Sequence, residues 1–177
     1  VRCFDSEKIT HVNSKISPSS DLETIKTEIV LSDLDIVQKK LEKGKKKLLE
    51  NKEIRILEEK LNQLDKNQEV KINNEEENKF LSNTGLLSIK PKIIVCNVDE
   101  DNLSKGNQYT EEVQNKYPNE KIIKICADIE DQLSGLDKNE KEAFMQDIGL
   151  NKTGLNQLIK EGYDLLKLDT FFTSGPE

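Results

Sequence analysis

The sequence lacks a glycine-rich phosphate-binding loop. Neither G-x-x-x-x-G-K-[S/T] nor G-x-G-x-x-G occurs among its eight glycines. Both patterns need glycine because a backbone without side chains can bring its N–H groups close to phosphate oxygens. We therefore expect that this chain by itself cannot cradle a triphosphate in the usual way.

Arginine and histidine are nearly absent. Only two of the 27 basic residues are arginine and the formal net charge is −7, so any contact with nucleic acid must be local. The single histidine, His11, stands in no Ser/His/Asp or Cys/His arrangement, and we expect it to be structural or exposed. The 34 carboxylates are too many for an acid/base pair to be singled out. We therefore expect no catalytic residue in this chain.

Cysteines are few and apolar runs are short. Cys3, Cys96 and Cys126 lie far apart, at spacings that match no metal site. We expect buried free thiols, no bound metal and a reducing, cytoplasmic setting. No apolar stretch approaches the ~20 residues that span a bilayer, and the N-terminus lacks the regions of a signal peptide. We therefore expect a soluble chain with no membrane partner.

Residues 17–87 predict an inserted helical hairpin. Ser17 and Pro18 fit the start of a helix, and two heptad seams follow that would bury each other as a short antiparallel coiled coil. The seam residues are Val30, Leu34, Val37, Leu41 and Leu48, then Ile54, Leu57, Leu61 and Leu64. Each seam is too short for a long free coiled coil. We therefore expect a monomer, with dimerisation through 30–64 as the alternative.

The hairpin region ends in a third predicted helix. The acidic run 75–77 favours a helix start, and Lys90-Pro91 marks its limit. We expect Phe80, Leu81 and Leu87 on its inward face.

Residues 1–16 and 88–172 predict parallel βα units. The apolar run after Pro91 predicts a strand buried on both faces, and residues 121–126 predict a second strand, each followed by a helix. Asp137 with Glu140 makes a capping box, and a last helix starts at Thr153. The apolar residues expected to cover the sheet from that helix are Leu155, Leu158, Ile159, Leu165 and Leu166. The predicted fold is α/β, a partial parallel sheet with a helical hairpin inserted.

The two ends of the chain resemble strands. Residues 1–4 look like the tail of a buried strand, and residues 170–172 predict an aromatic strand that enters a turn at 173–177. We therefore expect a piece of a longer protein.

A polar tetrapeptide, Asn97-Val98-Asp99-Glu100, follows the first predicted strand. Ligands of open α/β sheets bind at the carboxyl ends of the strands, and this tetrapeptide resembles the N-K-x-D motif with which P-loop GTPases read guanine. A carboxylate at the fourth position accepts both guanine donors, whereas adenine presents a lone pair there. Val98 in place of lysine and Glu100 in place of aspartate depart from the guanine pattern. The alternative is an ordinary polar turn at a strand end.

The sequence around this motif resembles the YchF/Obg-like ATPase family. The resemblance is strongest at 1–12, with Val-Arg-Cys-Phe and Ile-Thr-His-Val, at 89–102, and at 163–177, with Phe-Phe-Thr-Ser-Gly-Pro. It implies a TRAFAC-class P-loop NTPase fold with an inserted hairpin, and an N-x-x-E motif that prefers ATP to GTP. It also implies a phosphate loop and Mg²⁺ ligands before Val1 and a TGS domain after a linker that begins at 173–177. The intact protein would hydrolyse ATP, and this chain alone would be inactive.

The resemblance also implies contacts with the nucleotide base and with the ribosome or RNA. The second base-contacting segment stands where the family has a Ser-Ala-Lys turn, after the second strand. The residues placed at the base are Asn97, Val98, Glu100, Cys126, Ala127 and Asp128.

Lysines crowd toward the predicted turn of the hairpin. A basic tip with Lys43, Lys45 and Lys46 could contact RNA phosphates. A solvated lysine-rich surface is the favoured alternative, because Glu42 interrupts the cluster and no arginine or aromatic group accompanies it. Two alternatives to the ATPase function stay open: a GTP-binding regulatory module, and a helical ribosome- or RNA-binding module.

Overall fold

The computed structural model describes residues 1–6, 15–44 and 49–172. These residues form two compact units, one of residues 1–19 and 91–177 and the other of residues 20–90. The predictions made for His11, Lys45, Lys46, Leu48 and 173–177 lie outside the described residues. No helix in the described part of the chain is both long and apolar enough to cross a membrane.

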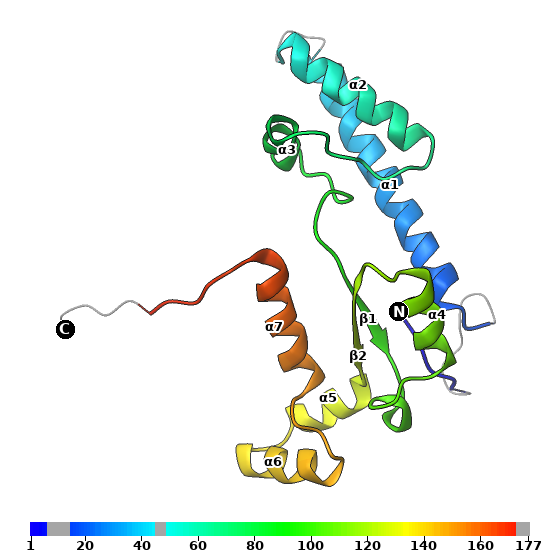
Figure 1. Cartoon of the computed structure of the whole chain (residues 1–177), viewed down its shortest axis with the longest axis vertical. Coiled ribbons are helices and arrows are strands. Elements are labelled where there is room, and N and C mark those ends of the chain that lie inside the picture. The colour runs from blue at the N-terminus through cyan, green and yellow to red at the C-terminus, as the bar shows by residue number, and fades with distance from the viewer. Residues whose placement is uncertain (7–14, 45–48, 173–177) are drawn as a thin grey trace, which may run out of the picture. The chain divides into compact units, whose positions relative to one another are not determined.

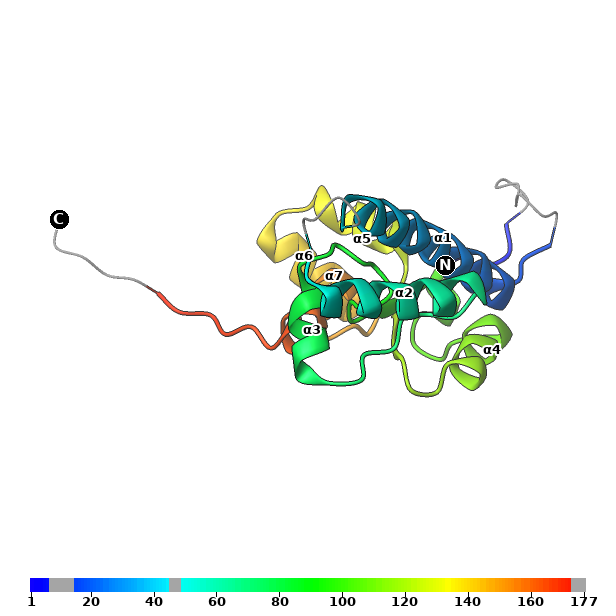
Figure 2. The same cartoon turned by 90° about the horizontal axis from the view of Figure 1, so that it is seen from above.

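Unit 20–90 is helical. It holds most of α1 (Pro18–Lys43), followed by α2 (Asn51–Asp65) and α3 (Glu75–Ser82). Helices α1 and α2 lie side by side in both views (Figures 1 and 2). The predicted seams supply much of its core: Val30, Val37, Leu41, Leu57 and Leu64 are buried together, and Leu34, Ile54 and Leu61 pack against them. Heptad spacing identified these residues because it places them on one face of each helix.

The inward residue after α3 differs from the prediction. Leu87 is 38% exposed, whereas Leu86 is 1% exposed and belongs to the core. The chain turns after α3, and the buried carboxylate of Asp33 accepts the main-chain N–H groups of Leu87 (2.7 Å) and Ser88 (2.9 Å). These two bonds fix the turn so that Leu86 points inward. Phe80 and Leu81 take the predicted inward positions.

A buried ion pair joins α2 to α3. The side chain of Lys60 is 0% exposed and that of Glu77 is 3% exposed, and the two form a salt bridge. Lys60 also bonds Glu59 at 3.1 Å, and Glu77 accepts the main-chain N–H of Asn73 at 2.6 Å. Buried charges persist in a protein interior when each has such partners.

The other unit is built on a parallel pair of strands. Strands β1 (Ile93–Asn97) and β2 (Lys121–Ile125) pair in register from Ile93 with Lys121 to Asn97 with Ile125. Residues 1–3 run along the other side of β1, where Arg2 bridges Asn97 in parallel. The strand-like start of the chain and the two predicted parallel strands are therefore confirmed.

The strands are less buried than predicted. Cys96 is the buried residue of β1 and Ile123 that of β2, and the others are partly or fully exposed. A strand becomes buried on both faces when helices cover both sides of the sheet. The described helices only partly cover this sheet.

Helices follow each of the two strands along the chain. Helix α4 (Gln108–Lys116) connects β1 to β2, and α5 (Ala127–Ser134), α6 (Lys138–Asp147) and α7 (Gly154–Leu166) follow β2 (Figure 1). The capping box of Asp137 and Glu140 is present at α6, and Thr153 caps α7. Strand, helix, strand, helix is therefore the observed order.

Helix α7 contacts β2 but does not turn its whole apolar face toward the sheet. Leu155, Ile159 and Leu166 are more than half exposed, so the prediction that this face covers the sheet is wrong for these residues. Gly154 lies against Ile125, and Glu161 forms an ion pair with Lys121 at 2.6 Å. Leu158 and Leu165 lie on this side of the helix and are partly buried.

The predicted aromatic strand at 170–172 is also wrong. These residues are irregular, and Phe171 and Phe172 are 81% and 96% exposed. A strand needs a neighbour to complete its hydrogen bonds, and none of the described segments pairs with this one.

Candidate nucleotide-base site

Asn97, the last residue of β1, makes hydrogen bonds to residues 1–3 and to the start of α5. Its side-chain Oδ1 accepts the N–H of Ala127 at 3.0 Å, which joins the end of β1 to the start of α5. Its main-chain N–H donates to the carbonyl of Val1 (2.8 Å) and its carbonyl accepts the N–H of Cys3 (2.7 Å). The two loops predicted to contact the base are thus joined by this side chain in addition to the pairing of β1 with β2.

Val98 and Cys126 lie behind these loops. Both are 2% exposed, and the N–H of Val98 donates to the carbonyl of Ile125 at 2.8 Å. Their side chains therefore face the interior of the unit, and what they can offer a ligand at this surface is main-chain atoms.

Asp99 shapes the loop that carries Glu100. Its carboxylate caps the 3-10 helix η2 (Glu100–Asn102) by accepting the main-chain N–H of Asn102 at 3.1 Å and its side-chain amide at 2.5 Å. Asp99 was not among the predicted site residues, although aspartate is a preferred residue at the start of a helical turn because its carboxylate accepts a main-chain N–H two or three residues later. The cap leaves Glu100 exposed at the start of the short helix.

Glu100 lines a cavity of about 270 Å³ next to the loop. Ile129 of α5 and Ile148 and Leu150 after α6 supply its apolar side, and Ser104 and Asp147 supply polar groups. The other predicted base residues do not line this cavity. Ala127 and Asp128 are exposed in the first turn of α5.

Two buried thiols, those of Cys3 and Cys96, lie next to Asn97. Cys3, Cys96 and Cys126 are all free and buried, as predicted. The thiol of Cys3 hydrogen-bonds Cys96, and this bond together with burial raises the pKa of Cys3 far above its ordinary value. Cys3 is therefore a neutral packing residue at physiological pH. The described residues contain no cluster of three or more His, Cys, Asp or Glu that could hold a metal ion.

The predicted basic tip is only partly described. Lys43 is the last residue of α1 and is exposed. It belongs to unit 20–90, whereas the base-loop residues belong to the other unit. The nucleic-acid contact at Lys43, Lys45 and Lys46 stays a prediction.

Comparisons with known proteins relate the chain to YchF proteins. No protein-family model matches it. Proteins named ribosome-binding ATPase YchF are similar to it in sequence: that of Escherichia coli O157:H7 is 36% identical over 99% of this chain and 50% of the relative. The Bacillus subtilis protein is 33% identical over 100% and 51%, and the Mycoplasma genitalium protein 36% identical over 99% and 51%.

A solved structure is similar as well. It is described as the YchF GTPase of Schizosaccharomyces pombe, and it matches with a TM-score of 0.76 and 25% identity over 94% of this chain and 48% of that one. The chain thus spans about half the length of the curated relatives it matches.

Proposed function

We propose that this chain, a YchF-family sequence, is the base-binding part of a YchF-type P-loop NTPase that binds and hydrolyses ATP. The support is its similarity to curated YchF proteins over 99% or more of its own length and about half of theirs. The observation that carries this proposal is the bond from Ala127 N–H to the Asn97 side chain. It joins the two loops at the carboxyl ends of β1 and β2, where open α/β sheets bind ligands.

We assign the base contacts to the two joined loops. Glu100 and Asp128 offer exposed carboxylates, and Asn97 fixes the spacing between the loops. Val98 and Cys126 contribute through their main chain because their side chains are buried. Val98 gives the base no cation of the kind that the guanine-reading motif has at this position. The assignment to adenine is supported by the ATPase in the names of the curated relatives, whereas the carboxylate of Glu100 by itself would also accept the two guanine donors.

Phosphate and Mg²⁺ binding do not fit the residues of this chain. The sequence has no phosphate-binding loop, and the described carboxylates form no metal cluster. We therefore assign these contacts, and the hydrolysis that depends on them, to parts of the intact protein outside this chain. The chain alone binds nucleosides weakly and hydrolyses nothing.

A helical ribosome- or RNA-binding module is the second candidate function. The curated relatives are named ribosome-binding, and Lys43 is exposed at the end of α1. In this proposal the protein acts in the cytoplasm as a monomer, and unit 20–90 contacts the ribosome. A GTP-binding regulatory module remains the alternative on the side of the base, since the Schizosaccharomyces pombe relative is described as a GTPase.

Titration of the isotope-labelled chain with adenosine and with guanosine tests the base assignment. NMR shifts should be larger for adenosine and should concentrate at 97–100 and 126–128. Asn97→Ala should weaken them because it removes the acceptor of the Ala127 N–H, whereas Asn97→Asp keeps an acceptor for Ala127 and should retain them. Asn139→Ala, in an exposed position of α6, is the matched control. Larger shifts with guanosine would support the GTP-binding alternative, and unchanged shifts in Asn97→Ala would refute the site.

A further inference from the structure

Strand β2 has a free edge. The register pairs Ile125 with Asn97, and the carbonyl of Ile125 accepts the N–H of Val98. Main-chain groups of successive strand residues point to opposite sides, so the N–H and C=O groups of Lys121, Ile123 and Ile125 face β1. Those of Ile122 and Lys124 face away from it. Among the described segments, none pairs with β2 on that side.

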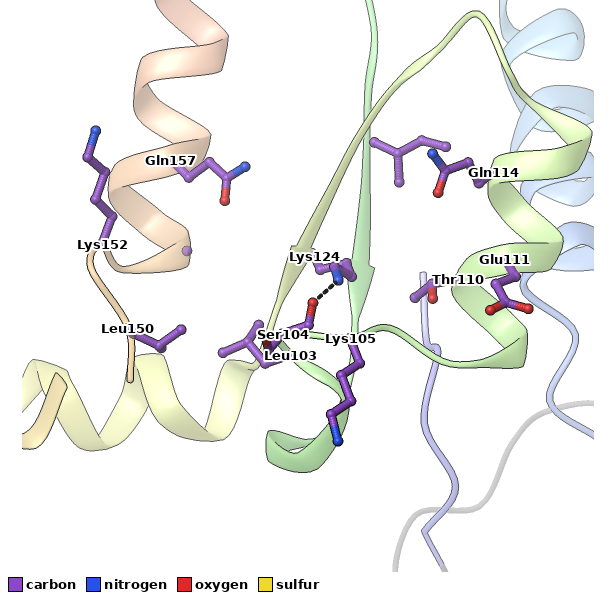
Figure 3. A pocket seen from close by; sticks show the side chains of 12 residues that line it. Leu103, Ser104, Lys105, Thr110, Glu111, Gln114, Lys124, Leu150, Lys152 and Gln157 are labelled. Atoms are coloured by element: carbon purple, nitrogen blue, oxygen red, sulfur yellow. Dashed lines mark hydrogen bonds between the residues drawn. The ribbon is translucent and has the colours of Figure 1, made fainter. Parts of the chain in front are cut away.

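A hollow of about 520 Å³ runs along this free edge. Figure 3 shows Glu111 and Gln114 of α4 on one side of the strands and Gln157 of α7 on the other, with Lys124 between them. The Lys124 ammonium donates to the carbonyl of Ser104 at 2.7 Å. Two helices thus form the walls of the hollow, and Ile122 and Lys124 form its floor. These are the residues whose main-chain groups face outward.

The hollow is basic in an acidic chain. Three lysines and one carboxylate occur among its 12 lining residues, Lys105, Lys124 and Lys152 against Glu111, whereas the whole chain carries a net charge of −7. Lysine on an edge strand opposes pairing with a second copy of the same basic edge. It favours an acidic partner instead.

The lining also argues against nucleic acid. It contains no arginine and no aromatic side chain, the groups that stack on bases and bind phosphate with two parallel bonds. A strand edge has outward N–H and C=O groups in alternation, and these match the main chain of an extended peptide.

We propose that the free edge of β2 binds an extended acidic peptide segment of a partner protein as an added strand. The main-chain groups of Ile122 and Lys124 form the ladder, and Lys105 and Lys152 at the rim pair with acidic side chains of the segment. This hollow adjoins the cavity that Glu100 lines, since Leu103, Ser104 and Leu150 line both, but none of the residues assigned to the base lines the hollow.

Hydrogen exchange gives the direct test. The probe is a synthetic Glu-Val-Glu-Val-Glu-Val peptide added to the whole labelled chain. In the free protein the amides of Ile122 and Lys124 should exchange quickly, while those of Ile123 and Ile125 are protected by β1. With peptide bound, the first two should become protected. Binding without this protection would overturn the added-strand proposal.

Charge and main-chain variants separate the two parts of the proposal. Lys105→Glu and Lys152→Glu should each weaken binding by about fivefold, whereas Lys138→Glu, an exposed control on α6, should not. Ile122→Pro removes one outward N–H but no bond to β1 and should abolish binding. Far-UV circular dichroism checks that it folds.

Two competing ligands complete the experiment. A Lys-Val-Lys-Val-Lys-Val peptide should not bind, and a short oligouridylate should not displace the acidic peptide. Equal binding of the basic peptide would refute the charge preference. Tighter binding of the oligonucleotide would assign the hollow to nucleic acid instead.

Discussion

Two ion pairs across the same helix pair should differ widely in their effect on stability. Lys60–Glu77 and Lys52–Glu76 both join α2 to α3, but the first pair is 0% and 3% exposed and the second 62% and 68% exposed. Removing one partner of a buried pair leaves an uncompensated charge and costs about 3 to 5 kcal/mol. Breaking an exposed pair costs about 0.2 to 1 kcal/mol. Lys60→Met should therefore lower the free energy of unfolding several times more than Lys52→Met.

The double variant Lys60→Met/Glu77→Leu sharpens this prediction. It removes both buried charges, and the N–H of Asn73, which loses its acceptor, belongs to an exposed residue, so water replaces this bond at little cost. It should therefore be more stable than Lys60→Met alone, with a coupling energy of at least about 3 kcal/mol.

The measurement must follow unit 20–90 separately. All three tyrosines belong to residues 1–19 and 91–177, so tyrosine fluorescence reports on that unit, whereas native-state hydrogen exchange at Leu57 and Leu81 reports on α2 and α3. The expected loss appears in the exchange of these amides. Equal losses for Lys60→Met and Lys52→Met, or a double variant as unstable as the sum of the single ones, would refute the reasoning.

Two further predictions concern the same unit. Asp33→Ala removes the acceptor of two main-chain N–H groups and should lower the free energy of unfolding, measured by hydrogen exchange, by about 2 to 4 kcal/mol. The control Asp35→Ala removes the exposed partner of Lys39 and should lower it by about 0.5 kcal/mol or less. Similar losses for the two variants would contradict the role of Asp33. The pKa of Glu59 is lowered by its bonds to Lys60 and Asn73, so its stabilising effect is present above the ordinary value of 4.5 and is lost as the pH falls below it. The stability difference between the parent and Glu59→Gln should shrink in urea titrations at decreasing pH, and a constant difference would contradict this cause.

Local signals in the sequence predicted local structure well. The capping box of Asp137 and Glu140 and the cap at Thr153 depend on residues within one turn, and both form. The heptad seams succeeded for a similar reason, because one spacing selects one face of a helix. The burial of Cys96 and Cys126 followed from the apolar runs that these residues close.

The errors concern contacts between distant residues. Leu86 replaced Leu87 in the core because Asp33, more than fifty residues earlier, fixes the turn. Leu155, Ile159 and Leu166 of α7 stay exposed because Gly154 and Glu161, on another side of the helix, contact β2, and Leu158 and Leu165 are partly buried on that side. Periodicity specifies which residues of a helix share a face, but the partner element decides which face is buried.

At the candidate base loop, too, the local arrangement was predicted from the sequence and the contact between distant residues was not. The spacing of strands and helices predicted that the ends of β1 and β2 lie next to each other, and the pairing of Asn97 with Ile125 confirms that neighbourhood. The bond from Ala127 to the Asn97 side chain depends on a rotamer and a loop path that no pattern encodes. Asp99 illustrates a missed local signal, since aspartate is a preferred capping residue at the start of a helical turn.

Strand β2 takes part in both the proposed base site and the proposed peptide site, through alternate residues. The odd-numbered residues of β2 bond to β1 and hold Asn97 in place, while the main chain of Ile122 and Lys124 faces the free edge. A variant at the rim, such as Lys105→Glu, therefore changes peptide binding without removing any bond that positions Asn97. If Lys105→Glu abolished the adenosine shifts at 126–128 as well, the two sites would not be independent. Retained adenosine shifts with weakened peptide binding would establish that the strand end and the strand edge are separate binding surfaces.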